Sequence, residues 1–291
     1  MGSKFCPACA IDGNVVGFSK TADIYECPIC RLRFLDSDRR GDAKNDNSWY
    51  SDLVGANTET IEVFIKTMEG PYTRQLDILG KLISGRKILD VGSGIGIYIY
   101  IAKKLGWEVD GCEESPYAEE FVKRHFSIVY RKFSAISPES YDAIRLSHVL
   151  EHIPEPVQFL EKIYGFLKPN GILLIIVPNC EPLLEFCMNK IRRLFSKRPR
   201  LAGAIYPDMH VLGFSVESLI NLINRNKHYF VVKAQTVGMG NKTYYPLFYD
   251  GLLMKHWPKT LSQIRYEFIR LASQLGTPFN RGEWIVAYFR K

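Results

Sequence analysis

The sequence predicts an α/β protein whose core is a mostly parallel, Rossmann-like sheet with helices on both faces. One observation is local: an apolar strand end at Lys87–Leu89 is followed by Asp90, then by glycines at alternate positions through Gly96, then by an amphipathic stretch. The second is global, because short apolar runs alternate with helical patterns from residue 85 onward. Strand, glycine-rich turn and helix together form the first crossover of a nucleotide-binding sheet.

The spacing of these glycines indicates the type of ligand. A pyrophosphate site needs Gly-x-Gly-x-x-Gly, but the sixth position counted from Gly92 is Ile97. The carboxylate of Asp90 would repel a pyrophosphate and would suit an ammonium group. S-adenosylmethionine (SAM) carries an α-amino group and a sulfonium but no phosphate, so the loop favours SAM over NAD.

A second acidic position completes this cofactor pattern. Glu113 follows the next predicted strand, 21 residues beyond Gly92, near the ~20-residue interval at which an acid meets the ribose hydroxyls. Glu114 is the alternative for the same role. Two acids placed in this way make the pattern far more specific than an isolated Gly-x-Gly.

These motifs resemble those of the class I SAM-dependent methyltransferases, in particular the subgroup that includes the ubiquinone-type O-methyltransferases. The resemblance covers about residues 85–235, with a matching last strand near 284–290. It is carried by Asp90–Gly96, Tyr141–Ile153, Leu167–Gly171 with the strand after it, and His210–Ser215. It implies a seven-stranded sheet, with SAM as donor and S-adenosylhomocysteine (SAH) as product. The implied cofactor contacts are Asp90, Gly92, Gly94, Gly96, Glu113, Glu114 and Ser147. The adenine contact stays open, because Arg131–Ser134 follows the expected third strand (Ser127–Tyr130).

Four of the seven cysteines form two Cys-x-x-Cys knuckles. Cys6 and Cys9 are separated by 17 residues from Cys27 and Cys30. This spacing fits a tetrahedral zinc ribbon, with short strands between the knuckles. The alternative is a redox pair, but thioredoxin-like sites carry a single Cys-x-x-Cys on a βαβ unit. We therefore expect structural zinc, bound as the ribbon folds.

The chain divides into three predicted parts. Residues 1–40 form the ribbon, residues 41–84 a linker and N-terminal helices that Pro71 separates, and residues 85–291 the SAM-binding domain. Two inserts interrupt that domain, at about 181–206 and 238–280. Ligands in this class of fold bind beyond the carboxyl ends of the strands, so both inserts are expected to roof the acceptor pocket.

Bulk properties narrow the class further. The 291-residue chain is 46% hydrophobic, which is typical of a globular core, and its net charge is +7. Its longest apolar run, Ile172–Val177, is far shorter than the ~18 residues that span a bilayer, and we see no secretory signal. We therefore expect a cytoplasmic protein. The positive net charge suggests an anionic partner, but it is too small to identify that partner as nucleic acid.

Two histidines are candidate catalytic bases. Methyl transfer mainly requires positioning, but a hydroxyl acceptor must also lose its proton, and imidazole can take it. His148 lies on the loop after the fourth strand of the resemblance, and His210 precedes Phe214-Ser215. The alternative for His210 is a core histidine that anchors a loop.

The segment His148–His152 is also a candidate binding site for a divalent cation. If it is helical, His148 and His152 share one face, with Glu151 adjacent. The segment resembles the Glu-x-x-Glu-His motif of the ubiquinone-type group, and that motif is associated with a divalent cation. His148 replaces the first of those acids, and Mg²⁺ prefers oxygen ligands. The alternative is a loop in which Glu151 bonds to backbone.

The first insert combines an apolar stripe with Lys and Arg residues over 183–200. Such a helix could lie on the inner membrane surface, track RNA phosphates, or be an ordinary solvated face.

The leading functional hypothesis is SAM-dependent O-methylation of a sugar, surface glycan or small metabolite, in part because Tyr25–Asp36 resembles ribbon-first methyltransferases of bacterial surface glycans and natural products. One alternative is an RNA base methyltransferase that holds RNA with the ribbon and the basic insert. No Asn-Pro-Pro-Tyr-type motif follows the fourth strand, which disfavours it. The other alternative is a non-catalytic SAM-binding protein.

Overall fold

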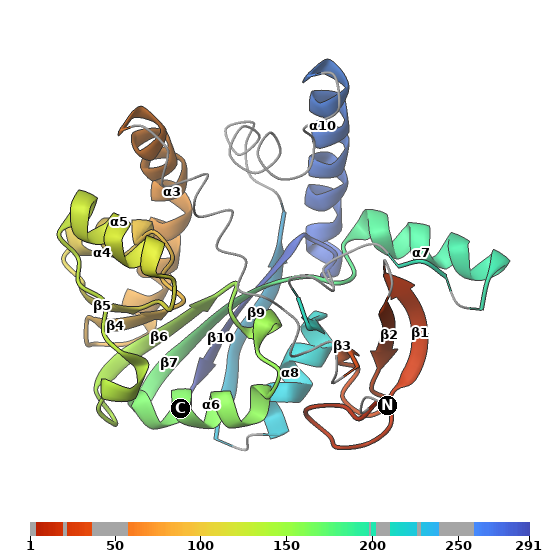
Figure 1. Ribbon diagram of the computed structural model, residues 1–291, viewed down its shortest axis with the longest axis horizontal. Helices are drawn as coiled ribbons and strands as arrows, with labels where there is room; N and C mark the ends of the chain where they lie inside the picture. Colours follow the sequence, from red (N-terminus) through yellow and green to blue (C-terminus); the bar gives the residue numbers. More distant parts are fainter. Residues whose placement is uncertain are drawn as a thin grey trace.

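The computed structural model describes residues 4–19, 22–36, 58–197, 199–201, 210–225, 228–238 and 259–291. Figure 1 shows the arrangement of its elements. In chain order these are β1 (Asn14–Ser19), β2 (Ala22–Glu26), β3 (Arg33–Leu35), α3 (Thr58–Leu82), β4 (Lys87–Val91), α4 (Ile97–Lys104), β5 (Glu108–Cys112), α5 (Pro116–Phe126), η1 (Phe133–Ala135), β6 (Tyr141–Ser147), η2 (Leu150–His152), α6 (Pro156–Phe166), β7 (Leu167–Pro178), α7 (Leu183–Phe195), β8 (Leu212–Gly213), α8 (Val216–Arg225), β9 (Phe230–Val237), α10 (Lys259–Gly276), η4 (Thr277–Phe279) and β10 (Trp284–Arg290).

The predicted α/β sheet is present, with strand order β5-β4-β6-β7-β10-β9. Strand β4 pairs in parallel with β5 and β6, and β6 with β7, whereas β10 runs antiparallel to both β7 and β9. The expected seventh strand is missing from the described residues. Ser127 adopts a left-handed conformation, and the Arg131 amide donates to Gly111 O, but residues 127–130 form no ladder with β5. The prediction of seven strands was therefore one too many for the described part of the chain.

Alternation along the strands divides the core between the two faces of the sheet. Leu174 and Ile176 of β7 pack with α3, α4 and α5, whereas Leu173 and Ile175 pack with α6 and α8. Side chains of a strand alternate between faces, so each strand can contribute to both cores. The glycine loop and the loop that contains His148 follow β4 and β6, two strands that are largely buried on both faces.

Helix α3 corrects one sequence expectation. It continues through Pro71, where two helices were predicted. Proline removes one backbone donor inside a helix, yet tertiary packing can outweigh that loss. Here Ile61 anchors the first half of α3, and Leu76 and Leu79 anchor the second half against the same core.

The ribbon forms a second sheet with order β1-β2-β3-β8. The two short strands expected between the knuckles are β1 and β2, which pair antiparallel. The fourth strand, β8, comes from the SAM-binding domain, and Arg33 and Phe34 of β3 pair with its two residues. The ribbon side chains Tyr25, Leu32 and Phe34 belong to the same hydrophobic core as α6 and α8.

The two inserts are only partly described. Residues 183–195 are helical as their spacing predicted, and α7 extends away from the body of the molecule in Figure 1. Residues 202–206 of the first insert, 239–258 of the second and 41–57 of the predicted linker lie outside the described residues. No helix in the described part of the chain is both long and apolar enough to cross a membrane.

Candidate cofactor and acceptor site

The glycine loop after β4 has the conformation that the sequence pattern requires. Gly92, Gly94 and Gly96 all have positive φ, at 70°, 55° and 72°. Space is limited as well, because a Cβ on Gly92 would lie 2.4 Å from Val149 Cγ2 and one on Gly96 2.8 Å from Val122 Cγ1. Only glycine combines this backbone with such close approach. The loop therefore exposes bare backbone at the carboxyl edge of the sheet.

Glu113 joins the loops that follow β4 and β5. Its Oε2 accepts a hydrogen bond from the Gly94 amide at 2.8 Å, and its Oε1 accepts from the Glu114 and Ser115 amides at 2.9 and 3.0 Å. Glu114, by contrast, is exposed. A carboxylate has about four acceptor sites, so Glu113 keeps capacity for further donors. Of the two acids, Glu113 is the one held at the glycine loop.

Asp90 is fully buried and paired with a residue that sequence reasoning missed. The Arg145 guanidinium donates to Asp90 Oδ1 at 2.7 Å, and it lies 4.1 Å from the ring centroid of Tyr98 and 5.1 Å from that of Tyr72. Burial raises the pKa of Asp90, while Arg145 acts in the opposite direction. The available signal was an arginine between Ile144 and Leu146 in an apolar strand, because buried charges need partners.

The residues present fit SAM. Asp90 Oδ2 is buried without a hydrogen-bond partner among the described groups, and an ammonium could satisfy it. The glycine loop provides a cradle that any Cβ would fill, and Glu113 stands beside it. Ser147 ends β6 and is half-buried at the same edge. The proposed contacts of all the predicted cofactor residues nevertheless stay predictions.

His148 lies directly after β6, beside the glycine loop. Its φ is positive, at 56°, and its amide donates to Ile176 O at 2.9 Å. The side chain is 47% exposed, and Nδ1 lies 3.3 Å from Glu151 Oε1. The next residue, Val149, packs so closely on Gly92 that a Cβ at position 92 would clash with it. His148 is thus the sequence neighbour of a residue that packs against the glycine loop.

Glu151 is a buried carboxylate among three imidazoles. Its side chain is only 1% exposed. The rings of His152 and His210 meet edge to face with centroids 4.8 Å apart, and the Val211 amide donates to the backbone oxygen of Glu151 at 2.9 Å. Burial raises the pKa of Glu151, but the neighbouring imidazoles of His148, His210 and His152 outweigh it, so the net pKa is lowered. The structure therefore brings both predicted catalytic histidines to one anion.

The candidate cation site differs in membership from the sequence expectation. Ligand atoms of Glu151, His152 and His210 lie within 4.8 Å of one another, so His210 takes the place predicted for His148. The reason is local, because residues 150–152 form a 3₁₀ turn in place of an α-helical face. One carboxylate and two imidazoles suit a transition metal better than Mg²⁺.

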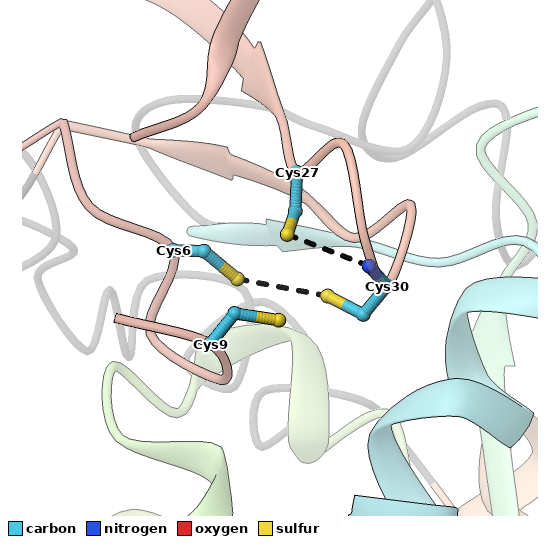
Figure 2. Close-up of side chains that lie close together, drawn as sticks. All are labelled: Cys6, Cys9, Cys27 and Cys30. Carbon is cyan, nitrogen blue, oxygen red and sulfur yellow. Dashed lines mark hydrogen bonds between the residues drawn. The ribbon is translucent and has the colours of Figure 1, made fainter. Parts of the chain in front are cut away.

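The two cysteine knuckles converge, as Figure 2 shows. The ligand sulfurs of Cys6, Cys9, Cys27 and Cys30 lie within 4.8 Å of one another, and the Cys6 and Cys30 Sγ atoms are 3.6 Å apart. The Ala8 amide points at Cys6 Sγ and the Cys30 amide at Cys27 Sγ, both at 3.4 Å. Four thiols on two tight turns are compatible with the donor set of a structural zinc site.

Comparisons with known proteins identify the family to which the chain is similar. Residues 64–229 match a family model described as a methyltransferase domain. The chain is 34% identical over 103 residues to the mitochondrial ubiquinone biosynthesis O-methyltransferase of Schizosaccharomyces pombe, covering 32% of this chain and 38% of that protein. It is 30% identical over 172 residues to the ubiquinone biosynthesis O-methyltransferase of Pseudomonas savastanoi, covering 50% and 73%. The match spans 38% of the Schizosaccharomyces pombe protein and 47% of two ubiquinone biosynthesis O-methyltransferases from Actinobacillus pleuropneumoniae, which is less than half the length of each.

Two solved structures are similar in fold. One is the plantazolicin methyltransferase BpumL in complex with SAH, with a TM-score of 0.48, 17% identity and coverage of 88% of this chain and 95% of that one. The other is a SAM-dependent methyltransferase from Archaeoglobus fulgidus, with a TM-score of 0.47, 15% identity and coverage of 78% and 94%.

Proposed function

This chain belongs to the class I SAM-dependent methyltransferases, and we propose that it methylates a hydroxyl of a sugar, a surface glycan or another small metabolite. SAM, when bound, supplies a methyl group on a sulfonium, and transfer of that group to oxygen leaves SAH. The observation that carries the proposal is the pairing of His148 with buried Glu151 beside the glycine loop. The names of the curated relatives, which are O-methyltransferases, support oxygen as the acceptor atom.

The cofactor half consists of three groups of this chain. Glu113 would accept hydrogen bonds from the ribose hydroxyls, and the backbone of Gly92–Gly96 would lie against the ligand. The free oxygen of Asp90 would face the ammonium, while Arg145 neutralises the other oxygen. This arrangement holds one charged group of the ligand without leaving a buried anion unpaired.

His148 is the proposed general base. Nδ1 lies 3.3 Å from Glu151 Oε1, so the imidazole could keep its proton on that nitrogen and present Nε2 to the acceptor hydroxyl. Glu151 then stabilises the imidazolium that forms when the hydroxyl proton moves to Nε2. His210 is the alternative base because it faces the same carboxylate.

The experiment that tests this function is an acceptor screen with methyl-labelled SAM. Nucleotide sugars, cell-wall glycans, phenolic metabolites and total RNA are incubated separately with the protein, and products are identified by mass spectrometry. The proposal predicts label in a methoxyl group of one hydroxyl-bearing class. Label confined to an RNA base would favour the RNA alternative, and SAM binding without transfer to any class would favour the non-catalytic one.

We also propose that the four-cysteine cluster binds one structural Zn²⁺. The support is the convergence of four thiols from two knuckles, which leaves no open coordination position for chemistry. Because the ribbon is too small to fold by core burial alone, metal binding and ribbon folding are expected to be coupled.

For α7 we propose contact with an anionic membrane surface. Its outer stripe contains Met188, Ile191, Leu194 and Phe195, all exposed, the last two at 80% and 85%. Lys190, Arg193 and Lys197 are exposed alongside this stripe. An apolar stripe flanked by cations favours the interface of an anionic bilayer, where a lipid-linked acceptor would be presented.

A further inference from the structure

The ribbon is joined to the acceptor site by a continuous series of backbone hydrogen bonds. Strand β3 pairs with β8, and the Leu35 amide donates to Val211 O at 3.1 Å. The Val211 amide in turn donates to Glu151 O at 2.9 Å. Val211 directly follows His210, so one residue connects the ribbon, the buried carboxylate and a candidate base.

Arg33 makes the corresponding side-chain connection. It is 8% exposed, and its guanidinium contacts Glu26 Oε2 of the ribbon at 3.0 Å and Glu181 Oε1 at 2.6 Å. It also donates to Cys180 O at 3.3 Å. Cys180 and Glu181 lie between β7 and α7, so a ribbon side chain contacts the segment that leads into α7.

The same segment is held from the other side. Arg281 pairs with Glu181, and the Cys180 amide donates to Phe214 O at 2.7 Å. Phe214 follows β8 directly, and its ring lies in the core that the ribbon shares with α8. Removal of Arg33 would leave the buried Glu26 with Arg31, at 2.9 Å, as its remaining cationic partner among the described residues. Buried carboxylates that lose a partner destabilise their surroundings strongly.

The cofactor half lies elsewhere. The glycine loop and Glu113 follow β4 and β5, which form one edge of the large sheet, whereas the ribbon lies on the other side of the molecule in Figure 1. The residues that Arg33 contacts are Glu26, Cys180 and Glu181, which are different from those of the glycine loop and Glu113. Substitutions at distant sites without shared partners act nearly independently. The acceptor half and the cofactor half can therefore be separated by experiment.

We propose that Arg33 is a positioning residue for the acceptor site, and that the metal-folded ribbon holds His210, Glu151 and the start of α7 in register. This inference rests on the proposed function for the identity of the acceptor site. The ribbon then has a structural role in the acceptor site of the same chain and needs no separate binding partner.

The test compares Arg33→Met with Arg33→Lys and with Arg31→Met in the full zinc-loaded chain. Arg31 is the matched control, because its 52% exposed side chain also contacts Glu26. Hydrogen exchange should accelerate about tenfold or more at the amides of Leu35, Val211 and Cys180 in Arg33→Met. Arg31→Met should match wild type. Arg33→Lys should restore part of the protection, because it returns the charge but cannot bridge Glu26 and Glu181 with two separate nitrogens.

Binding of SAH and the histidine NMR spectrum supply the specific readouts. Calorimetry should give a Kd for SAH within about twofold of wild type in Arg33→Met. The imidazole resonances of His210 should move, while those of His125, exposed on α5, should not. For an acceptor identified in the screen, the KM of that acceptor should rise while the KM of SAM holds.

Two results would overturn the inference. One is unchanged exchange at Val211 and Cys180 in Arg33→Met. The other is a loss of SAH binding together with a loss of chemical-shift dispersion for the imidazole resonances of His125, which would indicate general unfolding. If Arg33→Met does not fold, Glu181→Gln breaks the same contact with less change in shape and is held to the same criteria. None of the exchange, calorimetric or NMR readouts needs turnover, so failure to find a methylated hydroxyl would count against the proposed function alone.

Discussion

The carboxylate of Glu113 accepts a hydrogen bond from the backbone amide of Gly94, and this contact joins the two halves of the cofactor pattern. The residues are 19 positions apart in the sequence, at the ends of neighbouring parallel strands. The pairing of β4 with β5 brings the glycine loop and the acid to the same edge of the sheet. The acid is thus positioned by the fold before any ligand binds.

Replacement of Glu113 by alanine should weaken SAM binding strongly. Hydrogen bonds to a charged group contribute about 1.5–3 kcal/mol each, so the loss of ribose contacts predicts a Kd roughly 10- to 100-fold higher. Isothermal calorimetry measures the change directly. Glu114→Ala is the matched control, since Glu114 is adjacent and exposed, and should bind SAM as wild type does. Equal affinities in the two variants would remove Glu113 from the cofactor site.

Cys6→Ser should abolish binding of one equivalent of zinc and unfold the ribbon. The thiolate is one of four ligands, and structural zinc contributes directly to folding. Elemental analysis and thermal denaturation give the two readouts. Cys187→Ser, at an exposed cysteine of α7, should retain the metal and the wild-type Tm. SAM affinity should be largely retained in Cys6→Ser. Metal-free wild-type protein, purified without chelators, would contradict the zinc assignment.

The sequence was sufficient for those parts of the fold that local patterns encode. The glycine loop is one, because the left-handed conformation of Gly92 and Gly96 follows from residue type and spacing. The two cysteine knuckles are another, since four thiols at that spacing converge in the structure as expected. The strand–helix alternation likewise predicted the sheet, apart from residues 127–130, which do not form the seventh strand.

Tertiary context determined the rest. Pro71 predicts a helix break, but packing of Leu76 and Leu79 keeps α3 continuous. The glycine pattern predicts that Asp90 faces the ligand ammonium, but it does not indicate Arg145, because the two residues are 55 positions apart and meet only when β4 pairs with β6. The use of β8 as the fourth ribbon strand is equally non-local, because Leu212 and Gly213 are too few to signal a strand.

Glu283 should make stability depend on pH. Burial raises its pKa from 4.5 to about 7, with Glu185 adding to the shift. The folded state therefore holds the proton more tightly than the unfolded state, so stability falls as pH rises from 4.5 to 7 and is lowest above 7. Glu283→Gln should be more stable than wild type at pH ~8, by on the order of 3 kcal/mol, and should match it at pH ~4.5.

Thermal denaturation across this pH range checks the prediction. Glu161→Gln, at an exposed position of α6, is the control and should follow the wild-type profile. A Glu283→Gln profile parallel to wild type at every pH would show that Glu283 does not titrate differently in the two states.

Double substitution Leu194→Ser with Phe195→Ser should reduce binding to vesicles that contain phosphatidylglycerol. Burial of each apolar side chain contributes about 1.5–3 kcal/mol, so sedimentation should show at least a tenfold loss. Val129→Ser is the control because Val129 is 74% exposed on a different part of the surface. Wild-type protein that fails to sediment with these vesicles at low salt would disprove the membrane contact of α7.

The most direct measurement is methyl transfer from labelled SAM to the hydroxyl acceptor panel by wild type, His148→Asn and His210→Asn. The account predicts a methoxyl product with wild type, a ~10²–10⁴-fold lower kcat in His148→Asn, and unchanged SAM affinity. The same loss in His210→Asn alone would transfer the role of base to His210. A methoxyl product formed equally fast by all three proteins would contradict a histidine base at Glu151, and label found only in RNA would contradict hydroxyl methylation itself.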